Sequence, residues 1–395
     1  MAWDNGNPDE PVRDRSCISI RLYIDVARAF ITSLRKFAVW LRNGLRTSGF
    51  KNSMPRPTIT DLAAAAGVSL ATVDRVLNAR TGVRQATVDR VNQAIKRIGY
   101  FRDPFAANLA RRRDFCVQAF VPAGDGQFAT ELRHAVGKTA GALASDRVDL
   151  ELTPFPAEDP YTLASLLDSV PAEGVDGLVI MAPETPQLRD AVRRLAQRGV
   201  PTAAVISDLP NSSCEFFVGI NNIAAGRTAG SLMGKFIGGG AAKVAVMTSS
   251  LQARDSLDRR LGFDQALSEA FPGIEVLPTI EGHDNPQAHA SALNRVLATH
   301  ADLRGVYSMG GGNRVLMDLL ALNDPARRIH VIAHELTPTT RDGLRADRLD
   351  AVITQDLGHI LRSAIRKLRA MRDSRPIVEE QERIRIEILV KDNLG

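Results

Sequence analysis

The stretch TDLAAAAGVSLATVDRVLNAR (residues 60–80) places two short helical patterns on either side of a single glycine. Thr60 can cap the first helix, and Gly67 supplies the tight turn that ends it. The alanines are small, so a second helix can approach the first closely. The inward face of this first helix is predicted to consist of Ile59, Leu62, Ala63 and Ala66.

A second helix is predicted to begin after Ser69, which can cap it, and to run through Leu77. Its apolar residues recur three and four apart, as on one face of a helix. A third helix is expected from about Gln85 to Ile98, after a turn at Gly82. Three short helices in this order indicate a helix-turn-helix module.

Positive charge is concentrated around this module. Residues 54–113 hold eleven Lys or Arg and four Asp, a net charge of +7. The whole chain carries +5, so the remainder sums to −2. A basic module joined to a nearly neutral body is typical of a nucleic-acid binder, although a solvated basic surface would give the same count.

Composition indicates a soluble, multidomain protein. The chain has 395 residues, of which 44% are hydrophobic and 24% charged, enough for two or three domains with sizeable cores. Its three cysteines lie far apart and predict neither a disulfide framework nor a zinc site. With no long apolar run and no secretion signal recognised, we expect a cytoplasmic protein that does not enter a membrane.

Residues 1–53 precede the module. Their segment 20–45 could form an amphipathic basic helix that touches a membrane or a partner. The alternative that we favour is a translated upstream stretch, with Met54 as the natural start.

The sequence from Thr58 to Arg111 resembles the DNA-binding head and hinge of the lactose- and galactose-repressor (LacI) family of transcription regulators. The resemblance rests on G-V-S, then T-V-x-R-V-x-N, and a G-Y before a hinge that ends in L-A. It implies that α-helical residues read operator DNA and that a hinge helix follows. The residues it assigns to DNA binding are Ser69, Leu70, Ala71, Thr72, Arg75, Asn78, Thr87, Tyr100, Ala106 and Leu109.

Within this set, Arg75 can make a bidentate contact to guanine, whereas Leu70 and Ala71 offer apolar surface for a thymine methyl group. The resemblance places Leu109 as a wedge in the minor groove, with Ala106 one turn earlier. Asp74 departs from the usual serine. It could restrain Arg75, accept a hydrogen bond from a cytosine amino group, or lie on the outer face, and the sequence leaves these alternatives open.

After residue 115, apolar strands alternate with helical segments, which predicts parallel sheets covered on both faces. The pattern restarts near residue 243, so two α/β lobes are expected. The resemblance implies that they form a periplasmic sugar-binding-protein fold. We assign 1–53 to an extension, 54–101 to the head, 102–114 to the hinge and 115–395 to the body, with lobes of about 115–241 plus 357–373 and 242–356 plus 374–395.

In that fold a ligand lies between the lobes, at the carboxyl ends of the strands. The residues expected there are Phe128, Ser207, Asp208, Arg259, Asn313, Glu335, Gln355 and Asp356. An aromatic face with Arg, Asp, Glu and Gln suits a sugar, polyol or sugar acid, and a purine also remains open. Asp208 or Glu335 could equally be a helix cap. His283, Asp284, His334 and Glu335 lack metal-ligand spacing, so neither a metal nor a cofactor is expected.

Together these patterns predict a dimeric repressor whose operator affinity responds to a small effector. A dimer is expected because a two-fold operator imposes symmetry and no apolar heptads follow residue 384. The alternatives are a sugar receptor for transport or sensing and an α/β enzyme. The basic head opposes the first. No phosphate-loop motif and no nucleophile with a base supports the second.

Overall fold

The computed structural model describes residues 57–77, 81–100, 114–156, 159–238, 240–283 and 285–394. The extension, Asn78, Asp284 and the hinge residues Ala106 and Leu109 lie outside the described residues. The chain divides into two compact units, Met1–Asp103 and Pro104–Gly395, which are considered separately. Within the described ranges no helix has the length and apolar character needed to cross a bilayer.

The first unit contains the expected three helices, α2 (Ile59–Ala66), α3 (Leu70–Leu77) and α4 (Gln85–Ile98). Their facing apolar side chains form a small core that includes Leu62, Val73 and Val91. Gly67 ends α2 in the left-handed conformation, with φ of 64°, as the tight turn requires. The helix-turn-helix prediction is therefore confirmed.

The beginning of α2 differs from the sequence prediction. Thr58, not Thr60, caps the helix: its hydroxyl accepts a hydrogen bond from the Asp61 backbone N–H, and the Asp61 carboxylate accepts one from the Thr58 backbone N–H. This reciprocal pair satisfies two helix-end groups at once, an advantage that Thr60 lacks. The helix consequently begins at Ile59, which is 38% exposed and does not belong to the inward face.

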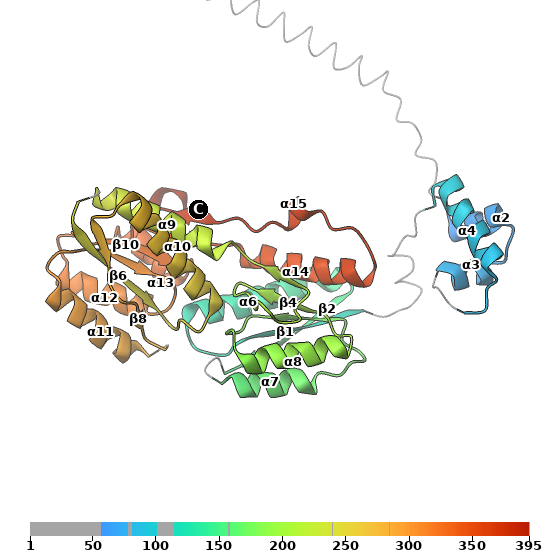
Figure 1. The fold of residues 1–395 in the computed structure, drawn as a ribbon, viewed down its shortest axis with the longest axis horizontal. Coiled ribbons are helices and arrows are strands. Elements are labelled where there is room, and N and C mark those ends of the chain that lie inside the picture. The colour runs from blue at the N-terminus through green and yellow to red at the C-terminus, as the bar shows by residue number, and fades with distance from the viewer. Residues whose placement is uncertain are drawn as a thin grey trace, which may run out of the picture. The chain divides into compact units, whose positions relative to one another are not determined.

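The first lobe of the second unit is built on a parallel sheet in the order β2-β1-β3-β4-β5. Its strands are β1 (Phe115–Pro122), β2 (Val148–Phe155), β3 (Gly177–Ile180), β4 (Thr202–Val205) and β5 (Phe216–Val218). Helices α6 (Gln127–Leu143) and α14 (Leu357–Arg372) cover one face, and α7 (Pro160–Ser169) and α8 (Pro186–Gln197) cover the other (Figure 1). Both faces are apolar, as is usual for parallel strands.

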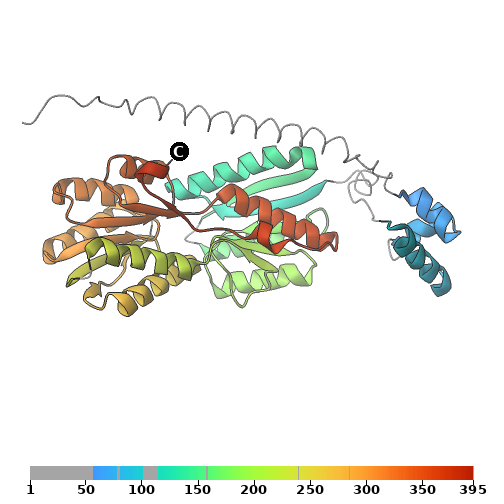
Figure 2. The same ribbon diagram turned by 90° about the horizontal axis from the view of Figure 1, so that it is seen from above.

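The second lobe is built on a sheet in the order β12-β11-β10-β9-β6-β7. Its strands are β6 (Ala242–Thr248), β7 (Ile274–Val276), β8 (Ile280–Glu281), β9 (Leu303–Ser308), β10 (His330–His334), β11 (Ala351–Thr354) and β12 (Glu387–Leu389). Only β12 pairs antiparallel; β8 pairs with β6. Helices α9 (Asn222–Ile237) and α10 (Arg254–Ala270) lie on one face, and α11 (Pro286–Thr299), α12 (Asn313–Asn323) and α13 (Pro338–Arg345) on the other. Figure 2 shows the two lobes side by side.

Helix α9 corrects the division of lobes drawn from the sequence. That division placed residues 222–237 in the first lobe, but α9 packs on α10, β9 and β10 and so lies with the second sheet. Its contact with α10 is close because glycines face each other. A Cβ atom on Gly226 would overlap the Arg259 carbonyl oxygen, and one on Gly262 would overlap the Ile223 carbonyl oxygen.

This crossing yields a stability prediction. Gly262→Ala should destabilise the protein by about 1–3 kcal/mol or more, because backbone atoms of α9 must move to admit the methyl group. The measurement is the free energy of unfolding in urea.

Gly137→Ala in α6 is the matched control. A Cβ atom there meets nothing within 4 Å, so the substitution should be neutral or stabilise the protein by about 0.5–1 kcal/mol. Equal effects of the two substitutions would contradict the close-crossing interpretation.

Candidate functional site

The predicted base-reading residues of the first unit lie on α3, with Leu70 and Ala71 in its first turn and Arg75 in its last turn. The Ser69 hydroxyl accepts a hydrogen bond from the Thr72 backbone N–H at 3.2 Å and so caps the helix. Leu70 is 48% exposed, and Ala71 and Arg75 are also exposed. These three side chains of α3 are therefore accessible to a partner.

The remaining predicted DNA contacts are distributed over the rest of the unit. Thr87 in α4 and Tyr100 after it are half-buried, and Tyr100 packs against the core of the three helices. Asp74 is half-buried, one residue before Arg75. Arg84 stands at the N-cap of α4 and its side chain makes no capping hydrogen bond.

In the second unit, the polar residues that follow the parallel strands meet at the junction of the two lobes. Ser207 follows β4, Glu335 follows β10 and Gln355 follows β11, and these side chains are 1%, 5% and 4% exposed. Arg259 reaches the same place from α10 and is 2% exposed. Four of the predicted effector residues are therefore buried at one junction.

The Arg259 guanidinium is the centre of the junction. Its Nε donates to Asn222 Oδ1 at 2.9 Å, Nη1 donates to the Met309 carbonyl oxygen at 2.8 Å, and Nη2 donates to Glu335 Oε1 at 3.1 Å. Asp255, one helical turn earlier, has Oδ2 at 3.6 Å from Nη1. A buried cation needs such compensation because desolvation disfavours its charged form.

Glu335 is held by donors on both carboxylate oxygens. Besides Arg259, Gln355 Nε2 donates to Oε1 at 2.9 Å, and Thr354 Oγ1 donates to Oε2 at 3.1 Å. Burial raises the pKa of Glu335, while Arg259 and these two donors oppose that shift. Three donors with no competing acceptor fix the orientation of this side chain.

A second pair of buried groups adjoins the first. Tyr307 Oη and His334 Nε2 are 2.9 Å apart, and the Tyr307 ring stacks on Phe263 with centroids 4.5 Å apart. Burial lowers the pKa of His334 well below its usual value, so its imidazole is neutral, and burial raises the pKa of Tyr307. Asn313 Nδ2 joins this pair by donating to the His334 carbonyl oxygen at 2.9 Å.

Several contacts connect the lobes at this junction. The Asp255 backbone N–H donates to Ser207 Oγ at 3.4 Å, and Asn222 Nδ2 donates to the Ile206 carbonyl oxygen at 3.1 Å. Farther out, Arg254 Nη1 lies 3.7 Å from Glu184 Oε2. The lobes therefore contact each other directly in this structure.

The other predicted effector residues lie outside this buried network. Phe128, in the first turn of α6, is half-buried against the first-lobe core. Asp208 is half-buried and its Oδ1 accepts from the Leu209 backbone N–H. Asp356 is exposed and caps α14 by accepting from the His359 backbone N–H at 2.8 Å. Asp356 therefore acts as a helix cap, a role that the sequence analysis considered for Asp208 and Glu335 and not for Asp356.

The structure adds residues that the sequence analysis did not select, namely Asn222, Asp255, Tyr307 and Thr354. Asp255 carries a local signal, since it lies four residues before Arg259 on the same helix face. Asn222 carries no local signal, because it lies 37 positions before Arg259 and meets it only where α9 crosses α10.

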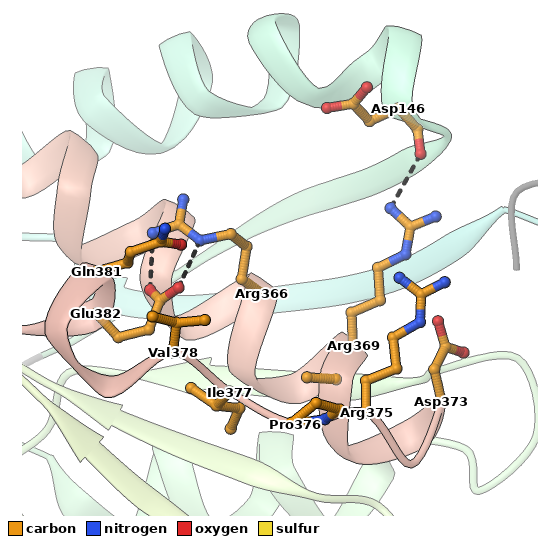
Figure 3. Close-up of a pocket in the computed structure, with 11 residues that line it drawn as sticks. Asp146, Arg366, Arg369, Asp373, Arg375, Pro376, Ile377, Val378, Gln381 and Glu382 are labelled. Carbon is orange, nitrogen blue, oxygen red and sulfur yellow. Dashed lines mark hydrogen bonds and ion pairs between the residues drawn. The ribbon is translucent and has the colours of Figure 1, made fainter. Parts of the chain in front are cut away.

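The cavity in Figure 3 lies elsewhere, along α14 and the segment after it, and has a volume of about 360 Å³. No predicted effector residue lines it. Its charged residues already interact: Arg366 pairs with Glu382, and Arg369 donates to the Asp146 carbonyl oxygen. With three arginines and three acids it has no surplus charge to recognise an ion, so the lobe junction is the stronger candidate. Among the described residues no group of three or more His, Cys, Asp or Glu is placed to hold a metal.

Comparison with known families agrees with both units. The profile of the lacI family of bacterial regulatory proteins matches residues 58–103, and that of the periplasmic binding protein domain matches residues 119–375. The chain belongs to the LacI family. Its first unit is therefore a helix-turn-helix DNA-binding head, and its second is a binding-protein body.

The individual relatives share less than a third of their residues with this chain. The HTH-type transcriptional repressor PurR of Mannheimia succiniciproducens is 28% identical over 242 residues, which cover 61% of this chain and 70% of the relative. PurR of Klebsiella pneumoniae is 23% identical over 269 residues, or 68% of this chain and 75% of the relative.

Solved structures resemble the body of this LacI-family protein. The glucose-galactose binding protein GanP of Geobacillus stearothermophilus has a TM-score of 0.63 at 19% identity and covers 71% of this chain and 99% of that one. A solute-binding protein of Burkholderia graminis in complex with D-arabinose has a TM-score of 0.63 at 23% identity, with 71% and 97% covered. At these identities the likeness establishes the fold alone.

The buried ion pair yields a prediction about pH. Arg259→Met should lower the free energy of unfolding by about 3–5 kcal/mol at neutral pH, because it leaves the Glu335 carboxylate buried without its cation. Glu335 already has a raised pKa, and loss of Arg259 raises it further. A carboxyl group with a raised folded pKa destabilises the protein above that pKa and ceases to do so below its unfolded pKa.

The deficit should therefore shrink as the pH falls toward 4.5, the ordinary value for glutamate. Urea unfolding of the variant and the wild type at several pH values measures it. Arg259→Met/Glu335→Gln, which removes both charges, should lose less stability than the sum of the single substitutions. The assignment of a buried Arg259–Glu335 ion pair would be contradicted by a loss of unfolding free energy that does not change with pH and that is additive for the two substitutions.

Proposed function

We propose that the protein is a homodimeric transcriptional repressor that reads a two-fold operator through α3 and responds to a sugar-like effector bound between its lobes. One observation carries the proposal. A single chain joins a LacI-type head, whose α3 exposes Leu70, Ala71 and Arg75, to a periplasmic-binding-protein body.

The chemistry of α3 supports operator reading. The second helix of a helix-turn-helix enters the major groove with its N-terminal residues toward the base edges. Arg75 then donates to the O6 and N7 atoms of a guanine, and Leu70 and Ala71 contact thymine methyl groups. Leu109 and Ala106 enter the minor groove at the centre of the operator, and Asn78, Thr87 and Tyr100 contact or support contacts to phosphates.

The lobe junction supports control by a small ligand. Solved relatives of the body are described in complex with D-arabinose, D-tagatose and D-allose. Ser207, Arg259, Asn313, Glu335 and Gln355 are our proposed effector residues, with Phe128, Asp208 and Asp356 at the periphery. An effector can change operator affinity only by binding one arrangement of the lobes more tightly, typically by about 1–3 kcal/mol.

Solved structures of sugar transport proteins resemble the body, which suggests a second function, that of a sugar receptor alone. The LacI-type head favours regulation, and the protein would then act in the cytoplasm without catalysing a reaction. Sequence-specific DNA binding separates the two readings.

Arg75→Ala should lower discrimination at one base pair in each half-site by about 1–3 kcal/mol, because the bidentate contact to guanine is lost. Selection from randomised operators, followed by sequencing, measures the preference at each position.

Arg90→Ala in α4 is the matched control. It removes the same charge from another exposed position of the head, so it should weaken binding to all sequences alike and leave the selected sequence unchanged. If Arg75→Ala also leaves the selected sequence unchanged, Arg75 does not read a base.

The oligomeric state is a separate prediction. A two-fold operator requires a two-fold protein, so sedimentation equilibrium should give twice the chain mass of 42.9 kDa. A monomer at the concentrations that saturate the operator, or a tetramer on dilution, would contradict the proposed dimer.

A further inference from the structure

Asp255 holds a carboxylate oxygen that the described residues leave without a partner. The side chain is 7% exposed, and its Oδ1 makes no hydrogen bond within the described part of the chain. Its other oxygen, Oδ2, lies 3.6 Å from Arg259 Nη1, so the ion pair orients the carboxylate while Oδ1 accepts no hydrogen bond from the described residues. A buried acceptor without a donor costs about 1–3 kcal/mol, so such an atom marks a place where a ligand can contribute a donor.

Two more unpartnered atoms belong to the same junction. Asn313 Oδ1 and His334 Nδ1 are buried and form no hydrogen bond with the described residues. They are linked, because Asn313 Nδ2 donates to the His334 carbonyl oxygen, and the residue after His334 is Glu335, which accepts from Arg259. Two of the three unpartnered atoms, Asp255 Oδ1 and Asn313 Oδ1, can only accept hydrogen bonds.

The charge of the junction excludes an anionic ligand. Arg259 is the one buried cation among the described residues, and its nearest charged groups are the carboxylates of Asp255 and Glu335. These three groups sum to −1, or to zero when Glu335 is protonated, and neutral His334 adds nothing. A ligand carboxylate or phosphate would thus be buried without a compensating positive charge.

The surroundings do not supply that charge. Arg259 directs its nitrogens at Asn222, Met309 and Glu335, so a ligand anion would have to displace an existing partner. Arg254 at the periphery lies between Glu184 and Asp258, at 3.7 and 2.9 Å. Hydroxyl groups, which both donate and accept, fit the unpartnered acceptors without this conflict.

Resting on the proposed function, we propose that the effector is an uncharged polyhydroxy compound, a sugar or polyol, whose hydroxyl groups donate to Asp255 Oδ1 and Asn313 Oδ1. Asp255 is then the residue that rejects sugar acids and sugar phosphates. This narrows the effector from the wider class of sugars, polyols, sugar acids and purines that the residue types alone allow.

The first experiment compares ligands that share one carbon skeleton. The full-length protein is screened by thermal shift and then by calorimetry with the aldose, polyol, sugar acid, amino sugar and phosphate ester of glucose, galactose, xylose and ribose, and with nucleobases. We expect one or more uncharged members to bind, and the acid and phosphate of the same skeleton to bind at least about tenfold more weakly.

The second experiment assigns the discrimination to Asp255. Asp255→Asn keeps the shape of the side chain and removes the charge, so the neutral ligand should bind more weakly and the gap between it and its acid should narrow. Asp318→Asn, at an exposed position of α12, removes the same charge away from the junction and should leave both affinities unchanged. Asn313→Ala should weaken the neutral ligand without narrowing the gap, which provides an independent test if Asp255→Asn does not fold.

The outcomes separate the two proposals. Tightest binding by a sugar acid, phosphate, amino sugar or nucleobase that also shifts operator affinity would overturn this inference and leave the repressor intact. If operator binding is sequence-specific but no compound in the panel binds, both the effector class and this inference fail while the head retains its role. An unchanged ligand ranking in Asp255→Asn would remove Asp255 as the discriminating residue.

Discussion

The close crossing of α9 and α10 is the constraint on which the rest of the body depends. Gly226 and Gly262 let the two backbones approach until a single added methyl group would overlap a carbonyl oxygen. That approach brings Asn222 of one helix to Arg259 of the other and holds the guanidinium at the strand ends. A wider crossing would take the Asn222 acceptor away from this buried cation, and an unsatisfied donor on a buried charged group is costly.

This helix packing positions the lobe junction, where we propose that the effector binds. The polar groups of the junction come from both lobes, and the Asp255 backbone N–H of the second lobe donates to Ser207 of the first, so the proposed effector would lie where the lobes meet. The buried pair of Arg259 and Glu335 fixes the geometry of the junction. We assign the choice between neutral and anionic ligands to the unpartnered acceptors.

Much of the fold was predictable because its signals are local. The bounds of α4 agree with the sequence prediction, since caps and 3.6-residue periodicity lie within the segment. The two wrong predictions, the cap of α2 and the lobe of α9, arose where contacts beyond the local pattern decide the structure. Thr58 competes with Thr60 as a cap through a reciprocal bond to Asp61, and α9 joins the second sheet because of glycine contacts distant in sequence.

Sequence patterns alone were enough to predict the helix-turn-helix head, the alternation of strands and helices in two lobes, and the placement of Ser207, Glu335 and Gln355 at strand ends. These follow from periodicity and from the rule that parallel strands present their carboxyl ends together. That Asn222 contacts Arg259, that Asp356 caps a helix, and which acceptors lack partners became known only from the packed structure. Hydrogen-bond partnership and burial depend on residues far apart in the chain, and no local pattern records them.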